Sequence, residues 1–167
     1  RFLYLNKTCY NGLYRVNSKG KFNVPMGRYK NPSILMEDKL KEASELLQGV
    51  TIKLQDFWGV LNDANKRDFV YFDPPYYPLS STANFTGYTP HNFLEEEQTR
   101  LADVYRKLNK KGCLLMESNS DTKLINELYE GFKKEIVKAR RMINSDATKR
   151  GAINEVLILN YEEDSDV

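Results

Sequence analysis

A carboxylate, two prolines and an aromatic ring directly follow an apolar run near the middle of the chain. Residues 68–72 read Asp-Phe-Val-Tyr-Phe, which is typical of a buried parallel strand. The hydrogen-bond ladder must stop at Pro74 and Pro75 because proline has no N–H to donate. Asp73 and Tyr76 are therefore expected at the carboxyl end of a strand, the place where open α/β sheets bind their ligands.

The chemistry that suits this arrangement is transfer of a methyl group to an exocyclic amine. An aromatic amino nitrogen is a poor nucleophile because its lone pair is delocalised into the ring. Two acceptors aimed at its hydrogens, the Asp73 carboxylate and the Pro74 carbonyl, would favour a more tetrahedral, more reactive nitrogen. Pro75 would stiffen the turn, and Tyr76 would offer a face on which a flipped-out base can stack. The competing interpretation is an ordinary proline-rich turn.

Composition describes a globular chain with a polarised charge distribution. The 167 residues are 41% hydrophobic and 12% aromatic, which suffices for one domain with a core. The first 36 residues hold seven Lys or Arg and no Asp or Glu, whereas the rest hold 18 basic and 23 acidic residues. A basic amino-terminal part on a mildly acidic body is typical of a polyanion-binding segment joined to a catalytic one.

Cysteine and histidine usage argues against a disulfide framework or a zinc site. Cys9 and Cys113 lie far apart in the sequence, and His91 is the one histidine. No stretch approaches the roughly 20 apolar residues of a membrane span, and we expect no signal peptide. We therefore expect a cytoplasmic monomer that holds no metal and does not enter a membrane.

The amino-terminal 30 residues contain turn and β signals and little helical periodicity. Residues 15–17 and 21–24 are expected to form the arms of a β-hairpin, with Gly20 in its tight turn. Aromatic residues alternate with cations here, which suits phosphate contacts combined with base stacking or wedging. These aromatic residues are Tyr4, Tyr10, Tyr14, Phe22 and Tyr29. A solvated basic hairpin is the alternative interpretation.

Two elements are expected between the hairpin and the central strand. Residues 33–48 have the apolar spacing of a helix, with Ser33 as a plausible N-cap, and residues 50–54 read as a short strand. At the end of that strand, Asp56 could accept a hydrogen bond from a cofactor amino group and Phe57 could pack against a purine. On position alone, an aspartate that caps the following turn explains Asp56 equally well.

The second half of the chain predicts alternating helices and strands after a long loop over residues 77–88. A capping box at Asn92 and Glu95 is expected to begin a helix that runs to Lys110 and ends before Gly112. After it we expect a buried strand over 113–116 that brings Glu117, Ser118 and Asn119 to the sheet edge. A short helix capped by Asp121 and two strands, over 135–139 and 154–161, are expected to follow.

Several stretches resemble the Dam-type (D12 class) DNA adenine-N6 methyltransferases. One is the Asp-Pro-Pro-Tyr motif at 73–76. The others lie in the amino-terminal segment: Leu5-Asn6, then Tyr-Asn-Gly-Leu-Tyr-Arg-Val-Asn at 10–17 and Gly-Lys-Phe-Asn-Val-Pro-Met-Gly-Arg-Tyr-Lys at 20–30. The resemblance implies an α/β fold with an incomplete Rossmann-like sheet, S-adenosylmethionine as cofactor, and duplex DNA with a flipped target adenine as partner. It also implies a short palindromic site, with GATC the leading candidate.

The resemblance assigns roles residue by residue. In the family the tyrosine of the Tyr-Asn pair wedges into the duplex and its neighbours help to read the target, which implies DNA contacts for Tyr10, Asn11, Leu13, Arg15, Pro25 and Arg28. Charge adds Lys19 and Lys21 as phosphate contacts, and similarity to the family's loop over the target base adds Asn84 and Phe85. The implied cofactor contacts are Asp56, Phe57 and Asp73, and the implied catalytic motif is Asp73, Pro74, Pro75 and Tyr76.

The resemblance is incomplete at the front of the chain. The family begins with a strand and a Phe-x-Gly-x-Gly-type loop, and none of the nine glycines here forms such a pair. We therefore expect residues 1–48 to be part of the DNA-recognition segment and residues 49–167 to be a catalytic domain that lacks its glycine-rich motif. Cofactor binding would then need an amino-terminal part. An inactive DNA-binding or subunit-type remnant of the same fold is the alternative function.

Overall fold

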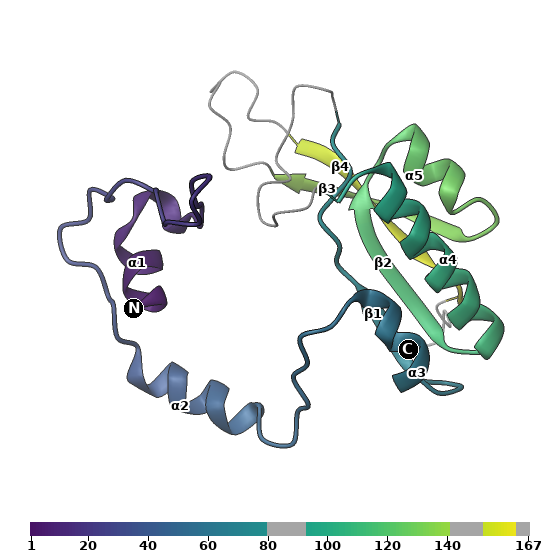
Figure 1. Cartoon of the computed structure of the whole chain (residues 1–167), viewed down its shortest axis with the longest axis horizontal. Coiled ribbons are helices and arrows are strands. Elements are labelled where there is room, and N and C mark those ends of the chain that lie inside the picture. The colour runs from purple at the N-terminus through teal and green to yellow at the C-terminus, as the bar shows by residue number, and fades with distance from the viewer. Residues whose placement is uncertain (80–92, 141–151, 163–167) are drawn as a thin grey trace. The chain divides into compact units, whose positions relative to one another are not determined.

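In the computed structural model of the chain, residues 1–79, 93–140 and 152–162 are described, and the chain divides into two units, Arg1–Leu54 and Gln55–Val167 (Figure 1). The first unit contains α1 (Phe2–Thr8), the 3-10 turn η1 (Tyr10–Gly12) and α2 (Glu37–Leu46). The second contains η2 (Phe57–Gly59), α3 (Val60–Asp63), β1 (Phe69–Phe72), α4 (Glu95–Lys111), β2 (Leu114–Ser120), α5 (Lys123–Leu128), β3 (Lys133–Arg140) and β4 (Ala152–Leu159).

The sheet of the second unit has the strand order β1-β2-β4-β3 and contains both parallel and antiparallel pairs. β1 runs parallel to β2, whereas β4 runs antiparallel to β2 and to β3. In the register, Phe72 of β1 lies opposite Glu117 of β2, which lies opposite Ile158 of β4. This mixed α/β architecture confirms the predicted fold class, an incomplete Rossmann-like sheet.

The core lies between this sheet and the helices α4 and α5, which run side by side in front of it in Figure 1. The apolar stripe of α4 is fully buried there, at Leu101, Val104, Tyr105 and Leu108. The last turn of α4 ends at Gly112, whose φ of +83° is in the left-handed region that glycine adopts without strain. The predicted end of this helix is therefore confirmed.

The position of β1 in the sheet corrects one prediction. β1 is the edge strand of the described sheet, so Phe69 and Tyr71 are 55% and 50% exposed, and only Phe72 is buried as predicted. Side chains alternate between the two faces of a strand. Where helices cover one face of the sheet, the side chains on the other face stay exposed. β2 is longer than predicted and continues through Ser120, so Glu117 lies inside the strand instead of beyond its end.

Two predicted helix starts in this unit are wrong. α4 begins at Glu95 with Leu94 at the N-cap position and no side-chain cap, and Asn92 lies outside the described residues. α5 is capped by Thr122, whose hydroxyl accepts a hydrogen bond from the N–H of Ile125, and not by Asp121. Both starts lie within one turn of the predicted positions.

The first unit differs more from its prediction. Residues 2–8 form α1, a helix too short to show two full turns of apolar periodicity in the sequence. α2 begins at Glu37, four residues after Ser33, because its acidic first turn, Glu37 and Asp38, complements the positive end of the helix dipole. The predicted hairpin turn is confirmed, although its arms make a single bridge, Val16 to Phe22.

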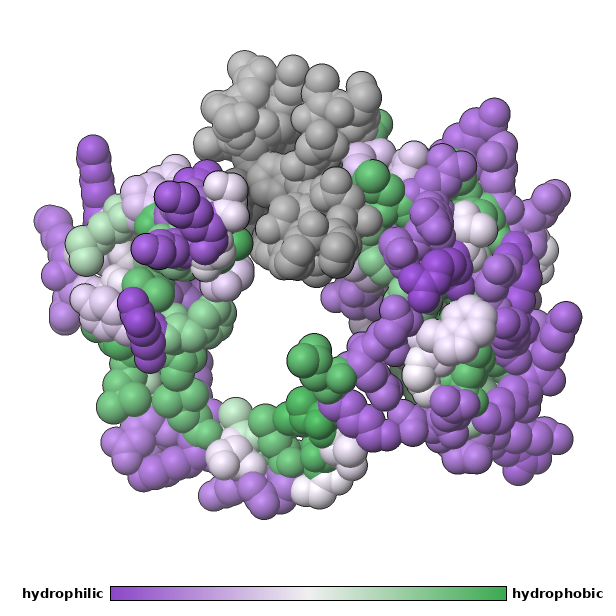
Figure 2. Space-filling model, in the orientation of Figure 1, coloured by the Kyte–Doolittle hydropathy of each residue, from purple (hydrophilic) through white to green (hydrophobic). Residues whose placement is uncertain are grey.

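Residues 50–54 do not form the predicted strand. A strand is stabilised by hydrogen bonds to a neighbouring strand, and among the described strand pairs none includes this segment. Its apolar side chains are exposed, at 79% for Ile52 and fully for Leu54, and Figure 2 shows hydrophobic surface along α2 and the segment after it. Within the described residues, no helix is both long enough and apolar enough to cross a membrane.

Candidate functional site

Asp73 lies immediately after the carboxyl end of β1, where the sequence places it, and its side chain is exposed. The Ser118 hydroxyl of β2 donates a hydrogen bond to Asp73 Oδ1 at 3.1 Å, and the Tyr71 hydroxyl lies 2.8 Å from Ser118 Oγ. Ser118 has a single proton and an ionised carboxylate only accepts, so Tyr71 must be the donor in the second bond. This chain of hydroxyls orients Asp73, whose side chain stays exposed.

Tyr76 is partly buried beside Asp73, and its hydroxyl donates to Glu155 Oε2 of β4 at a long 3.5 Å. Burial raises the pKa of the Tyr76 phenol, and the carboxylates of Glu155 and Asp73 add to this effect. The phenol therefore stays neutral at ordinary pH. Tyr76 can offer a ring face and a hydroxyl donor, but it cannot act as a base.

The face of β2 that lies against the helices carries a buried carboxyl group. Glu117 is fully buried, and burial raises its pKa from 4.5 to about 7, although hydrogen bonds from Tyr129 and Asn119 oppose this shift. The same burial raises the pKa of Tyr129, which donates its hydroxyl to Glu117 Oε2. Alternation along β2 thus places Ser118 on the Asp73 side and Glu117 in the core.

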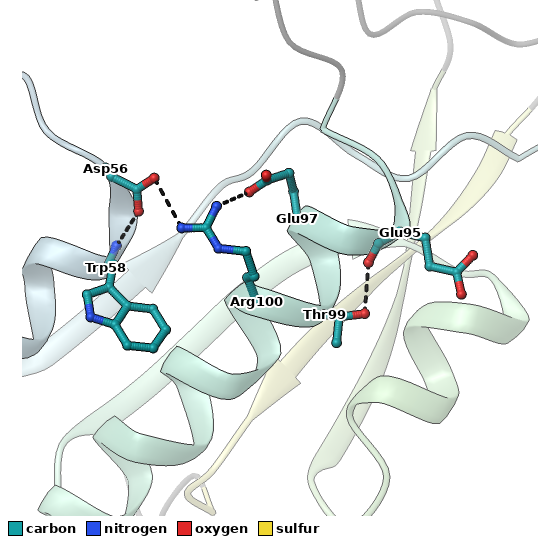
Figure 3. A network of polar contacts seen from close by, with 6 residues as sticks. All are labelled: Asp56, Trp58, Glu95, Glu97, Thr99 and Arg100. Carbon is teal, nitrogen blue, oxygen red and sulfur yellow. Dashed lines mark hydrogen bonds and ion pairs between the residues drawn. The ribbon is translucent and has the colours of Figure 1, made fainter.

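Asp56 and Phe57, the predicted cofactor contacts, are held together by Arg100 of α4. Asp56 accepts from the Trp58 N–H at 2.9 Å, and its other oxygen lies 3.5 Å from Arg100 Nη2 (Figure 3). Arg100 also pairs with Glu97 at 2.6 Å, and its guanidinium lies 5.1 Å from the centre of the Phe57 ring. Asp56 therefore caps η2, as the alternative interpretation held.

The Asp56 carboxylate remains exposed although it caps η2, so it can still accept a hydrogen bond from a ligand. A carboxylate acceptor beside an aromatic ring fits the nucleoside end of S-adenosylmethionine, which presents an amino group, hydroxyls and a purine face. Sequence reasoning did not identify Arg100 as part of this group. The sequence gives little indication of this role, because a lysine or arginine on an exposed helix face is usually solvated.

Three of the predicted DNA contacts meet in the first unit. Tyr10, Asn11 and Arg28 line one open hollow of about 540 Å³, which Met26, Gly27 and Tyr29 complete. Residues 25–27 return beside residues 8–10: the Tyr10 N–H donates to the Pro25 carbonyl and the Gly27 N–H to the Thr8 carbonyl, both at 2.8 Å. A Cβ on Gly27 would lie 2.9 Å from the Cys9 carbonyl oxygen, so this close approach requires glycine.

The remaining predicted contacts lie around the hairpin. Lys19 and Lys21 are exposed at its tip, where Asn17 Oδ1 accepts from both of their backbone N–H groups. Arg15 folds onto the opposite arm, with Nε donating to Asn23 Oδ1 at 2.9 Å and Nη2 to the Asn23 carbonyl at 3.1 Å. Part of its guanidinium is thus engaged within the hairpin, although the side chain is exposed.

Leu13 is half-buried, and its carbonyl accepts from Cys9 Sγ at 3.2 Å, which joins the two residues that flank η1. The structure does not place Leu13 among the residues that line the hollow. Asn84 and Phe85, predicted over the target base, lie outside the described residues. Met26, Gly27 and Tyr29 were missed as lining residues, although all three lie within the stretch that carries the resemblance.

Comparison with known proteins identifies the family of this chain. Residues 1–143 match the model of the D12 class N6 adenine-specific DNA methyltransferase family, and the chain belongs to that family. The predicted resemblance is confirmed.

Several relatives align along almost the whole of this chain. The type II methyltransferase M.MjaIII of Methanocaldococcus jannaschii is 54% identical over 163 residues, which are 96% of this chain and 56% of the relative. M1.LlaDCHI of Lactococcus lactis subsp. cremoris is 45% identical over 96% of this chain and 57% of its own length. The DNA adenine methylase of Escherichia coli K12 is 41% identical over 95% of this chain and 56% of its own length. The chain thus spans little more than half the length of these relatives.

Proposed function

We propose that the protein containing this chain transfers a methyl group from S-adenosylmethionine to N6 of adenine in duplex DNA, at a short palindromic site of the GATC type. The observation that carries the proposal is the exposed Asp73 carboxylate at the end of β1, oriented by Ser118 and followed by Tyr76. Membership of the D12 class family supports it, as do relatives named type II methyltransferase and DNA adenine methylase.

At the reacting nitrogen, Asp73 accepts one hydrogen of the adenine amino group and the Pro74 carbonyl accepts the other. These bonds favour a tetrahedral nitrogen with a localised lone pair, so they are stronger in the transition state than in the bound substrate. The neutral Tyr76 ring stacks on the extrahelical base. Because the Asp73 carboxylate is exposed, it can pass the proton released by the nitrogen to water.

S-adenosylmethionine, when bound, supplies an electrophilic methyl group. Asp56 and Phe57 would hold its nucleoside end, with the Asp56 carboxylate as an acceptor and the Phe57 ring against the purine. Arg100 keeps both side chains in place through its ion pair with Asp56 and its contact with the Phe57 ring. The Arg100 pair with Glu97 in turn fixes the guanidinium on α4.

DNA recognition is assigned to the first unit. Arg28 is exposed at the hollow and can pair with O6 and N7 of guanine. Tyr10 lines the same hollow and is the residue that enters the duplex. Lys19 and Lys21 extend from the hairpin tip toward phosphates. Arg15 contributes by holding the hairpin closed against Asn23.

The test uses the complete protein, labelled S-adenosylmethionine and unmethylated duplex DNA. Asp73→Ala should reduce transfer about a hundred- to a thousandfold, the loss expected when one preorganised transition-state hydrogen bond is removed, with DNA binding retained. Asp103→Ala is the matched control, since Asp103 is an exposed carboxylate on α4 that pairs with Arg106. Transfer by Asp73→Ala within tenfold of wild type would refute the assignment. DNA binding without any transfer by the wild-type protein would instead support an inactive DNA-binding remnant.

A further inference from the structure

Two buried amide side chains connect the Pro75–Tyr77 turn to the core. Gln98 of α4 and Asn119 of β2 are both fully buried. Gln98 Nε2 donates to the Pro75 carbonyl at 3.0 Å, and Asn119 Oδ1 accepts from the Tyr77 N–H at 3.1 Å. The two amides also bond to each other, with Asn119 Nδ2 donating to Gln98 Oε1 at 3.0 Å. The bonds form a closed ring that runs from the turn through both side chains and back.

The direction of every bond in this ring follows from the chemistry of the groups. The backbone N–H of Tyr77 can only donate, so the oxygen of Asn119 must face it, and the N–H of Ser120 donates to the same oxygen at 2.9 Å. The amide nitrogen of Asn119 then faces Gln98 Oε1 and Glu117 Oε1, both acceptors. Gln98 is left with its nitrogen toward the Pro75 carbonyl. Flipping either amide would set donors against donors.

The ring acts on one residue in particular. The Pro75 carbonyl belongs to the peptide unit before Tyr76, and the Tyr77 N–H belongs to the peptide unit after it. Holding both units fixes the two backbone dihedrals of Tyr76. Ser120 strengthens the hold, since its hydroxyl donates to the Tyr77 carbonyl at 2.5 Å. The Tyr76 hydroxyl lies at a long 3.5 Å from Glu155 and also bonds to Ser118, whereas the bonds to the Pro75 carbonyl and the Tyr77 N–H hold the backbone on both sides of Tyr76.

We propose that Gln98 and Asn119 are positioning residues that clamp the backbone around Tyr76 so that its ring and the adjacent Asp73–Pro74 acceptors keep their reactive arrangement. The proposal rests on the proposed function for its catalytic meaning. Packing alone does not require an amide at position 98, because most of the other buried side chains of α4 are hydrophobic, at Leu101, Val104 and Leu108. A polar side chain on such a face is retained where it holds a specific partner.

The variant that tests the clamp is Gln98→Met in the complete protein, because methionine keeps the length of the side chain and loses both hydrogen bonds. The matched control is Tyr105→Phe, which removes bonds from the same helix and core to the Leu115 and Ile158 carbonyls without touching the turn. Both variants are compared at a temperature at which thermal unfolding shows them to be folded.

The clamp is tested by amide hydrogen exchange and by the rate of methyl transfer. Amide hydrogen exchange of the segment 73–79 should be faster in Gln98→Met than in wild type and unchanged in Tyr105→Phe. The single-turnover rate constant for methyl transfer should fall about ten- to a hundredfold in Gln98→Met, with the Kd values for DNA and S-adenosylmethionine within about threefold, as expected for misplacement of reacting groups. Tyr105→Phe should keep a rate constant within about twofold of wild type.

Unchanged exchange at 73–79 in Gln98→Met would overturn the clamp itself. Faster exchange with an unchanged transfer rate would overturn its positioning role and leave Gln98 as a structural residue. Absence of transfer by the wild-type protein would refute the proposed function, and the exchange measurement would still decide whether the clamp exists.

Discussion

Replacing Glu117 by glutamine should change how the stability of the fold depends on pH. Glu117 is buried in the row Phe72–Glu117–Ile158 of the sheet, where two apolar neighbours flank its carboxyl group. Its pKa is raised from 4.5 to about 7, so in this interval the folded chain binds a proton that the unfolded chain releases. The resulting stabilisation is fully present below pH 4.5 and is lost as the pH rises through about 7.

The magnitude follows from the shift. One pKa unit corresponds to about 1.4 kcal/mol, so a shift from 4.5 to about 7 corresponds to about 3 kcal/mol. Glutamine has the same size and can still bond to Tyr129 and Asn119, but it does not titrate. We therefore expect the free energy of unfolding of Glu117→Gln, minus that of wild type, to increase by about 3 kcal/mol between pH 4.5 and about pH 8.

Urea unfolding followed by circular dichroism at a series of pH values measures this difference. Glu130→Gln is the control, because Glu130 is exposed in the turn after Tyr129 and its difference from wild type should stay flat. Tyr129→Phe should move the pH dependence of wild type to higher pH, since it removes a donor that favours the ionised carboxyl group. A flat difference for Glu117→Gln would refute the reasoning, because it would mean that the carboxyl group titrates as it does in water.

Two further predictions concern DNA recognition. Lys21→Ala should weaken binding to all sequences alike and reduce its salt dependence, whereas Arg28→Ala should cost about 1 to 3 kcal/mol at the cognate site and little elsewhere. Titrations of both variants on cognate and altered duplexes check this, and equal losses on all duplexes for Arg28→Ala would exclude a base-reading role. Gly27→Ala should destabilise the first unit by about 1 to 3 kcal/mol through the clash with the Cys9 carbonyl and weaken DNA binding. Thermal unfolding with a binding titration measures both, and wild-type values would show that the close approach can relax.

The end of β1 and the motif that follows it could be predicted because local residues decide them. An apolar run stopped by Pro74 and Pro75 has few alternatives, and Gly112 ends a helix by its own backbone preference. The apolar stripe of α4 likewise predicts which of its faces is buried. In these cases the sequence pattern and the tertiary structure favour the same result.

Other features depend on contacts that a sequence does not display. Residues 50–54 have strand composition, yet a strand also needs a neighbour with which to share its hydrogen bonds. The clamp on Tyr76 requires α4 and β2 to approach one turn from separate parts of the chain. One signal was available: Gln98 is a polar residue three positions before Leu101 on the buried stripe of α4. The role of Arg100 carried no such signal, because Asp56 and Phe57, which it contacts, lie more than 40 positions earlier in the chain.

The most direct test of the account is to map N6-methyladenine by sequencing in DNA from a methylation-deficient host that expresses the complete protein. We predict N6-methyladenine at a palindromic GATC-type site with the wild-type protein, and only the host background with Asp73→Ala. A modified motif that lacks GATC would overturn the proposed specificity and leave the chemistry intact. DNA without N6-methyladenine, from cells in which the wild-type protein is folded and abundant, would contradict the central claim that this chain belongs to an active adenine methyltransferase.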